Sequence, residues 1–414
     1  MTPSAGGPAL IARIQAALRE DGVAAWLFFD FHGTNPIARR VLGVGEGPGA
    51  SKTTRRWFYL VPCEGEPVKL THRIEPRALE HLPGRTTVYL TREELERGLA
   101  ALAAPVLGEG GRRSGHAATV AMEYSPGARL PYVSRVDAGT VELVRATGLH
   151  VVSSADLAQR FDGVLAPEAR ADHRRTGETL HGILDAAFAH VRERVTARRP
   201  VTESGLTRWI LERFESAGLV SSEPPCVAVN AHSADPHYAA AGGEDLPIGE
   251  GDFLLIDAWA KARRPGSIYA DYTEVAFVGR AAPESHTKVF AVVRDARDAA
   301  VAFVRDALRA GRLVRGYEVD DAARGVVRSR GYGDRFVHRT GHSIGEEVHA
   351  NGVHLDNLET CDERRLLDGT LVSVEPGIYL DAFGMRSEVN LLIDGGVAVV
   401  TPERVQREIP ALLA

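Results

Sequence analysis

Five residues in the second half of the chain have side chains suited to binding divalent metal ions. They are Asp257, Asp271, His342, Glu375 and Glu388. Each lies at the end or start of a short apolar run, or in a glycine-rich loop. Four carboxylates and one imidazole form the ligand set that hard or borderline divalent ions prefer when two of them bind side by side. We therefore expect a dinuclear metal centre of the kind that activates water in a hydrolase.

The two aspartates flank a predicted hairpin. Asp257 follows the apolar run 253–256, and Asp271, which lies 14 positions later (271 − 257), opens a second strand-like run. The segment Arg-Arg-Pro-Gly at 263–266 has the composition of a turn. A carboxylate at the end of a buried strand is costly unless it is paired or bound to a metal, and a hairpin would bring both aspartates to one place. The alternative is that each aspartate only caps a turn.

The imidazole belongs to a cluster of histidines. Four of them fall within 17 positions: His338, His342, His349 and His354. Gly341 and Gly345 allow the backbone around His342 to approach other segments closely. They also break a helix, so the spacing does not match a zinc site built on one helix. A surface or nucleic-acid-binding role for the cluster is the alternative. His237, in a loop at 235–238, is weak evidence by itself.

The two glutamates also border apolar runs. Glu375 ends the strand-like run 371–374 and precedes Pro-Gly, and Glu388 opens the run 388–393. Arg386 lies two residues before Glu388, a spacing that places both side chains on one face of a strand. An arginine near a ligand carboxylate commonly orients it. For either glutamate alone, a salt bridge in the core is the alternative.

The elements that would position these residues suggest two α/β domains, at 1–165 and 166–414. In the first, strand candidates at 23–29, 57–61, 68–71, 88–90 and 119–122 alternate with helical stretches near 93–103 and 138–147. The polar segment 165–175 is the expected linker. In the second, two amphipathic helices precede the aspartate strands, and two more, near 289–308 and 318–330, precede the glutamate strands. This repetition hints at an internal duplication, although the two halves share too little identity to claim one.

The composition is that of a globular protein. The chain has 414 residues, 44% of them apolar and 25% charged, with a net charge of −6, so about two domains are expected. No basic stripe suggests nucleic acid, and no run approaches the ~20 apolar residues of a membrane span. Three dispersed cysteines argue against a disulfide framework. Without a recognisable signal peptide, we expect a cytoplasmic protein.

Taken together, the motifs resemble those of the creatinase/aminopeptidase P/prolidase family of metallopeptidases. They are Asp257 followed by Tyr-Ala-Asp-Tyr-Thr (269–273), Gly-His-Ser-Ile-Gly-x-x-Val-His (341–349), Val-Glu-Pro-Gly-Ile-Tyr (374–379) and Arg-Ser-Glu (386–388). The resemblance implies a C-terminal "pita-bread" α/β domain behind a smaller creatinase-type α/β domain, and a homodimer. It also implies two divalent ions, Mn²⁺, Co²⁺, Fe²⁺ or Zn²⁺, bound by the five residues above.

The same resemblance assigns roles around the metals. His237 and His349 would contact the substrate and the scissile amide, and His338 would line the site. Two ions lower the pKa of a shared water, and Glu375 would hold or accept its proton. The implied reaction removes an N-terminal residue from a peptide or splits a dipeptide, Xaa-Pro bonds included. The residues themselves add Arg386, near a ligand carboxylate, and Trp259, which lies two positions from Asp257 and should share its strand face.

The chain departs from the family pattern near the metal ligands. The 258–270 hairpin is longer by about three residues, and Trp259, Glu274 and Val389 stand where glycine, arginine and aspartate are usual. These changes keep all five ligands but leave proline specificity open. They motivate a second hypothesis, a lyase or another C–N hydrolase of a small non-peptide substrate. A non-catalytic binding protein or a metal-free, creatinase-like enzyme is a weaker alternative, because all five ligands are present.

Overall fold

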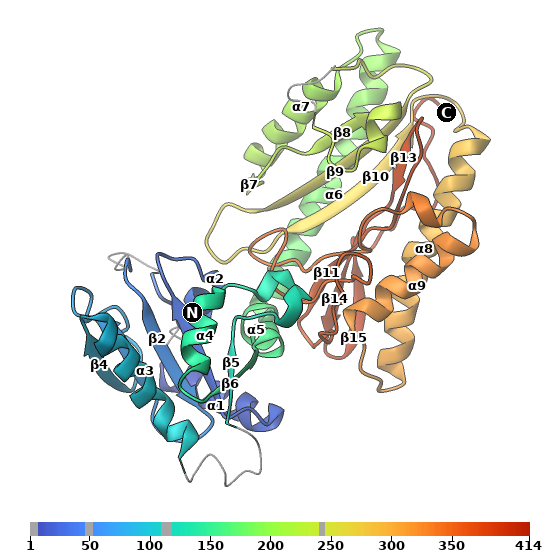
Figure 1. Ribbon diagram of the computed structural model, residues 1–414. Helices are drawn as coiled ribbons and strands as arrows, with labels where there is room; N and C mark the ends of the chain where they lie inside the picture. Colours follow the sequence, from blue (N-terminus) through green and yellow to red (C-terminus); the bar gives the residue numbers. More distant parts are fainter. Residues whose placement is uncertain (1–6, 46–52, 109–117, 240–244) are drawn as a thin grey trace. The chain divides into compact units, whose positions relative to one another are not determined.

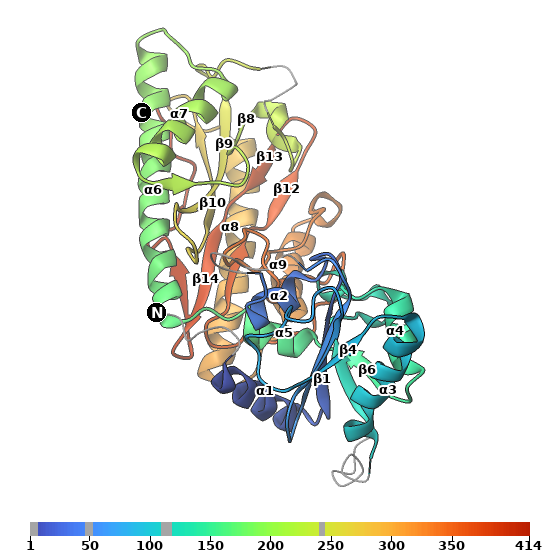
Figure 2. The ribbon, with the colours of Figure 1, turned by 90° about the vertical axis from the view of Figure 1, so that its left-hand side faces the viewer.

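The computed structural model describes residues 7–45, 53–108, 118–239 and 245–414, and it divides into two compact units, Met1–Asp162 and Gly163–Ala414. Figures 1 and 2 show the chain in two views. The division falls three residues before the expected boundary. The mixed α/β architecture expected from the sequence is present in both units. Among the described helices, none is long and apolar enough to cross a membrane.

The N-terminal unit is a single six-stranded sheet with helices on both faces. Its elements are α1 (Pro8–Asp21), β1 (Ala25–Asp30), α2 (Pro36–Leu42), β2 (Trp57–Pro62), β3 (Val68–His72), β4 (Arg85–Tyr89), α3 (Arg92–Leu107), β5 (Thr119–Met122), η1 (Pro126–Ala128), η2 (Pro131–Val133), α4 (Ala138–Arg145), β6 (His150–Ser153) and α5 (Ala155–Asp162). The strand order is β4-β3-β2-β1-β5-β6. Only β2 runs against its neighbours.

Alternation along the central strands explains the two-sided core. In β1, Trp26 and Phe28 pack with α1, α2 and α5, whereas Leu27 and Phe29 pack with α3 and α4. All six residues of β1 are buried, as expected for a strand covered on both faces. The strand expected at 88–90 is displaced, since β4 spans Arg85–Tyr89 and only its last residue is buried.

The C-terminal unit contains two halves, each with two helices followed by strands. The first half comprises α6 (Pro167–Thr196), α7 (Glu203–Ser216), β7 (Leu219–Val220), β8 (Cys226–Val229), η3 (Asn230–Ala234), β9 (Phe253–Ala262) and β10 (Ala270–Phe277). The second comprises α8 (Glu284–Arg309), α9 (Gly316–Ser329), η4 (Gly333–Arg335), β11 (Leu371–Val374), β12 (Gly377–Tyr379), β13 (Gly384–Arg386), β14 (Val389–Asp394) and β15 (Val397–Thr401).

The strands of each half pack against the helices of that half. Helices α6 and α7 cover one face of the β9–β10 hairpin, which pairs with β7 and β8. Helices α8 and α9 cover the sheet of β11, β14 and β15 and the small sheet of β12 and β13. The two strand layers adjoin in the middle of the unit (Figure 2). Backbone N–H of Glu388 donates to the carbonyl of Thr273 there, at 3.1 Å.

The linker expected at 165–175 is wrong from Pro167 onward, because these residues form the first turns of α6. Proline is favourable at the first helical position. Arg170 forms ion pairs with Asp394 (2.7 Å) and Asp368 (2.8 Å) near β14. His173 is buried, with hydrogen-bonding partners on both ring nitrogens. The polar residues of this segment are therefore satisfied within the unit.

Candidate metal centre

The antiparallel hairpin of β9 and β10 places both aspartates on one face of the sheet. In the register, Asp257 lies opposite Thr273, and Trp259 lies opposite Asp271. Residues directly opposite in such a pair point to the same face, so Asp257 and Asp271 are diagonal neighbours. Alternate residues such as Tyr272 point into the core against α6 and α7. The hairpin predicted from the turn composition at 263–266 is present.

The other three residues come from the second half of the unit. Glu375 follows β11, and Glu388 precedes β14. His342 lies in a loop beside β11, where its backbone N–H donates to Ser373 Oγ and its carbonyl accepts from Ser373 N, both at 2.9 Å. A Cβ on Gly341 would lie 2.0 Å from the Ser373 carbonyl oxygen. Only glycine therefore allows the His342 loop to approach β11 this closely.

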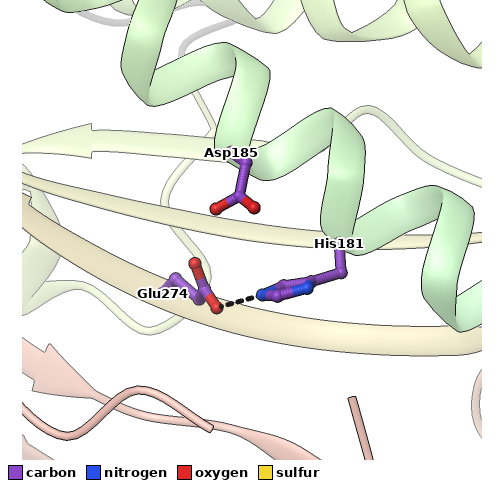
Figure 3. A group of neighbouring side chains, drawn as sticks. All are labelled: His181, Asp185 and Glu274. Carbon is purple, nitrogen blue, oxygen red and sulfur yellow. Dashed lines mark hydrogen bonds and ion pairs between the residues drawn. The ribbon is translucent and has the colours of Figure 1, made fainter. Parts of the chain in front are cut away.

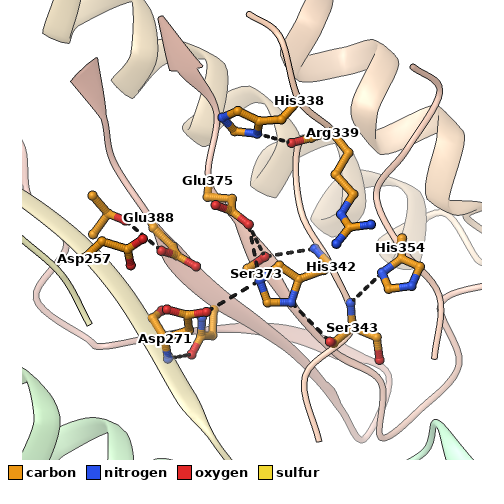
Figure 4. A network of polar contacts seen from close by, with 12 residues as sticks. Asp257, Asp271, His338, Arg339, His342, Ser343, His354, Ser373, Glu375 and Glu388 are labelled. Carbon is orange, nitrogen blue, oxygen red and sulfur yellow. Dashed lines mark hydrogen bonds and ion pairs between the residues drawn. The ribbon is translucent and has the colours of Figure 1, made fainter. Parts of the chain in front are cut away.

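The five side chains converge between the two strand layers, as Figure 4 shows. Nε2 of His342 lies 3.3 Å from Glu375 Oε1 and 3.5 Å from Asp271 Oδ2. One possible ligand atom each from Asp271, His342 and Glu388 lies within 4.8 Å of the others. Asp257 is joined to the group through Arg386, which approaches both Asp257 and Glu375. The structure thus brings together all five residues that the sequence singles out.

Three carboxylate oxygens in this cluster are buried without a hydrogen-bonding partner among the described residues. They are Oδ1 of Asp257, Oδ1 of Asp271 and Oε1 of Glu388. An ionised carboxylate oxygen that has lost water and gained no partner carries a large desolvation cost. Divalent cations would satisfy all three oxygens. The donor set and its bare oxygens therefore fit a metal centre.

The electrostatics of the cluster also favour bound cations. Burial, reinforced by the neighbouring carboxylates, raises the pKa values of Asp271 and Glu388 well above their ordinary range. Burial would likewise raise the pKa of Glu375, but His342, His338 and Arg386 lower it below its usual value. Four carboxylates thus face one space with a single arginine among them. Bound cations would allow all four to be ionised together.

Arg386 contacts two of these carboxylates, Asp257 at 2.6 Å and Glu375 at 4.0 Å. Its guanidinium donates to Asp257 Oδ2 (2.6 Å), Thr273 Oγ1 (3.0 Å) and the hydroxyl of Tyr379 (2.8 Å). The side chain is buried, so the geometry favours the orienting role over substrate contact. Arg386 and Glu388 do not lie on one strand as expected, although both side chains contact Thr273 Oγ1. Arg386 ends β13, and Glu388 lies in the link before β14.

The remaining histidines lie at different depths. The His349 ring packs edge-on against that of His342, with centroids 4.3 Å apart, and its side chain is exposed. Neighbouring His342, and the loss of water from the part of the ring that packs against it, lower the pKa of His349 to about 3. His338 is half-buried beside Tyr379, 2.8 Å from its hydroxyl, and burial lowers its pKa to about 4. His237 lies exposed in the turn after η3, and its backbone N–H donates to Asp235.

Of the three departures from the family pattern, only Trp259 faces the candidate site. Its indole N–H donates to Ser222 Oγ at 3.2 Å, and its ring packs beside an apolar cluster that includes Tyr269 and Ile344. Val389 packs instead into the core of the second half. Of these substituted residues, Trp259 is therefore the one placed to alter which substrates the site binds.

Glu274 points to the opposite face of the hairpin, toward α6. There it is buried and lies 3.1 Å from Nε2 of His181, with Asp185 one helical turn further along (Figure 3). Possible ligand atoms of these three residues lie within 4.8 Å of one another. Arg404 already contacts both His181 and Asp185, so a protein cation balances this group. The change at Glu274 does not reach the candidate metal centre.

Several residues that position the ligands escape sequence reasoning. Ser373 donates to Glu375 Oε1 (3.0 Å), and Thr273 donates to Glu388 Oε2 (2.9 Å). Asn390 binds the backbone of Asp271 on both sides, accepting from its N–H (3.1 Å) and donating to its carbonyl (2.7 Å). Their spacing in the sequence is the signal that could have revealed them. Each lies two positions from a ligand on the same strand or link, so the two side chains point to the same side.

Comparison with solved structures identifies the fold. The chain is similar to dipeptidase PepE from Mycobacterium ulcerans, with a TM-score of 0.66 and 23% identity over 97% of each chain. It is also similar to an X-prolyl aminopeptidase from Caenorhabditis elegans, described as a cytosolic enzyme with a di-nuclear active site. That likeness has a TM-score of 0.63 and 15% identity, over 93% of this chain and 58% of the other. The expected pita-bread fold is confirmed.

Comparison of sequences identifies the family. An Xaa-Pro dipeptidase from Pyrococcus furiosus is 32% identical over 168 residues, which are 40% of this chain and 43% of that protein. The chain spans about half the length of the first curated relatives it matches. The model of metallopeptidase family M24 matches residues 172–395, more than half of the chain and the whole span of the candidate ligands. The chain therefore belongs to metallopeptidase family M24.

Proposed function

We propose that the protein is a metal-dependent peptidase that removes an N-terminal residue from a short peptide or splits a dipeptide, Xaa-Pro bonds included. The observation that carries the proposal is the convergence of four carboxylates and one imidazole. Three of the carboxylate oxygens are buried with no hydrogen-bonding partner among the described residues. Family membership and the relatives named as Xaa-Pro dipeptidase and X-prolyl aminopeptidase support it. Fold alone would not, because one fold hosts many reactions.

Asp257, Asp271, His342, Glu375 and Glu388 would hold two divalent ions, of Mn²⁺, Co²⁺, Fe²⁺ or Zn²⁺. When bound, such a pair supplies an activated water and polarises the scissile carbonyl. Glu375 is the group that would hold or accept the water's proton, since its Oε1 faces His342 and its charge is favoured by its neighbours.

Substrate contacts are assigned to three histidines. His349 has an exposed side chain beside the ligand His342, so it can donate to the developing oxyanion. His338 is placed by Tyr379 at the edge of the cluster. His237 would position the substrate from the turn after η3, which is anchored beside β13 by a Ser233–Gly384 hydrogen bond. From the same family likeness we infer a cytoplasmic location and a homodimer. Light scattering on the purified protein would test the oligomeric state.

The test of the proposed function is amino-acid release by metal-loaded protein. We expect Mn²⁺- or Co²⁺-loaded protein to cleave members of a panel of Xaa-Pro dipeptides, other dipeptides and Xaa-Pro-Yaa peptides, and EDTA treatment to abolish cleavage. Metal analysis should give about two ions per chain in the active sample. A sample that holds two metals and cleaves none of the peptides would overturn the peptidase assignment.

Trp259 supports a second candidate function, a lyase or C–N hydrolase acting on a small non-peptide substrate. Its ring lies opposite Asp271 on the metal face of the hairpin, where it would reduce the space available to a peptide. We expect Trp259→Gly to change relative kcat/KM values across the panel by about tenfold, comparable to filling or emptying a small apolar pocket, while metal content stays constant. Equal relative rates before and after the substitution would exclude this role. Trp209→Gly, a half-buried tryptophan on α7, is the control.

A further inference from the structure

The N-terminal unit contains a cleft of about 1020 Å³ at one edge of its sheet. Its walls include His32 after β1, His72 at the end of β3, Arg92 after β4 and Arg135 after β5. These four strands run parallel to one another, because β2 alone is reversed. The cleft therefore lies at their carboxyl ends. In open α/β sheets this edge is where ligands bind, and none of the candidate metal ligands belongs to this unit.

The cleft is strongly basic although the chain is acidic overall. Four arginines line it: Arg55, Arg56, Arg92 and Arg135. The one lining carboxylate, Asp137, is engaged locally, since it accepts from the backbone N–H (2.9 Å) and the hydroxyl (2.7 Å) of Thr140. Arg92 pairs with Glu93 at 3.2 Å and Glu96 at 4.0 Å, but these pairs are exposed and neutralise little. The Glu75 carboxylate lies beside Arg55, whose backbone N–H donates to it at 3.1 Å. The described residues give Arg56 and Arg135 no acidic ion-pair partner.

Two side chains that line the cleft, Arg135 and His72, have N–H groups that could donate hydrogen bonds to a ligand. Nε of Arg135 is buried and has no hydrogen-bonding partner among the described residues, a cost that a bound acceptor would relieve. The planar guanidinium matches carboxylate and phosphate groups. On His72, Nδ1 accepts from the backbone N–H of Ile74 at 3.1 Å. This contact places the hydrogen of a neutral ring on Nε2, which is then a donor.

Apolar and aromatic side chains complete the walls. Phe29, Tyr89 and Val136 are buried and line the cleft, whereas the rings of Phe31 and His32 are exposed at its edge. The backbone of His32 is left-handed, with φ at 58°. This conformation is uncommon for residues other than glycine and occurs at binding sites more often than elsewhere. A ligand for these walls has an anionic group and a small apolar or planar body.

We propose that this cleft binds a small organic anion. Its phosphate or carboxylate group contacts Arg135 and Arg56, and its apolar body rests on Phe31 and Tyr89. The lining residues include none of the candidate metal ligands, so the proposal does not rest on the proposed peptidase activity. Because phosphate and carboxylate use the same donors, the two sources of negative charge are separated by the choice of probe.

The experiment measures binding to the full-length protein by isothermal titration calorimetry. The probes are phenyl phosphate, inorganic phosphate, benzoate and benzamide, an uncharged isostere of benzoate. We expect at least one of the two aromatic anions to bind at least tenfold more tightly than benzamide, and its affinity to fall as salt rises. Phenyl phosphate and benzoate then report which anionic group is preferred. Inorganic phosphate reports the contribution of the apolar body.

Substitutions test the assignment of residues. Arg135→Gln and Arg56→Gln should each weaken binding of the preferred probe at least tenfold, whereas Arg135→Lys, which keeps the charge but loses the fork, should weaken it less. Arg77→Gln, an exposed arginine outside the cleft, is the control. The proposal is overturned if neither aromatic anion binds at 10 mM, a concentration of the order of weak, non-physiological contacts. It is equally overturned if Arg56→Gln and Arg135→Gln both bind the probe like the unmodified protein.

Discussion

Glu388→Gln should abolish metal-dependent turnover while leaving the metal-free protein as stable as before, or more stable. The substitution keeps the shape and the hydrogen bond from Thr273, but it removes one negative charge from a buried group of four. Metal affinity should fall by at least the ~100-fold that loss of an outer partner of a ligand can cost. Without metal, relief of repulsion with Asp271 should offset any lost interaction. Metal analysis and thermal unfolding with and without Mn²⁺ measure both effects.

The structure provides a matched control in Glu274→Gln. Glu274 is a buried glutamate on the other face of the same hairpin, paired with His181 rather than with the ligand group. Its substitution should leave the metal content unchanged. His342→Ala and Glu375→Ala should behave like Glu388→Gln in turnover, with circular dichroism showing a folded chain. If Glu388 is instead a structural salt-bridge partner, Glu388→Gln will lower the metal-free unfolding temperature and spare metal binding.

Arg324→Met should destabilise the C-terminal unit by about 3–5 kcal/mol, the cost of leaving one member of a buried ion pair alone. Arg324 and Asp320 on α9 are both buried and 2.9 Å apart. Arg324 also donates to the carbonyls of Phe336 (3.0 Å) and His338 (2.8 Å), and Asp320 accepts from the backbone and hydroxyl of Thr340. The pair therefore anchors the loop that carries His342, so metal affinity should fall with stability.

Denaturant unfolding of the metal-free protein measures this loss. Arg328→Met, one turn along the same helix at an exposed position, should change stability by no more than about 0.5 kcal/mol. The double substitution Asp320→Leu with Arg324→Met should recover part of the loss, because no charge then remains buried without a partner. An Arg324→Met protein as stable as the control would show that the pair contributes nothing to holding the loop.

Much of the candidate site can be predicted from the sequence, because its charged residues lie next to apolar runs that are expected to be buried. Asp257 and Glu375 each follow an apolar run, and a carboxylate in such a place needs a partner. The end of β11 could therefore be predicted from the sequence. The expected strand end at Asp257 is wrong, because β9 continues to Ala262 as one arm of the hairpin. The partner of Arg386 could not be predicted, because Asp257 lies 129 positions away in the sequence. The strand that contains Arg386 also ends before Glu388. Two-residue spacing does not reveal that a link separates β13 from β14.

The two wrong predictions about the fold also arise from interactions between residues far apart in the sequence. Residues 167–175 look like a linker because their charges are balanced by Asp368 and Asp394, about 200 positions later in the chain. Strand β4 lacks an apolar pattern because four of its five residues are exposed, and its pairing with β3 determines its bounds. Local periodicity cannot reveal elements whose stability comes from distant partners.

The assembly of the metal centre from two halves of one unit has a consequence for cooperativity. Asp257 and Asp271 belong to the first half, and the other three residues belong to the second. The halves adjoin through the Glu388–Thr273 backbone bond and the two bonds of Asn390. A cation bound by both halves joins segments that local opening would otherwise separate. We therefore expect partial unfolding of the apo-protein to begin at this seam, and metal loading to make the two halves unfold as one.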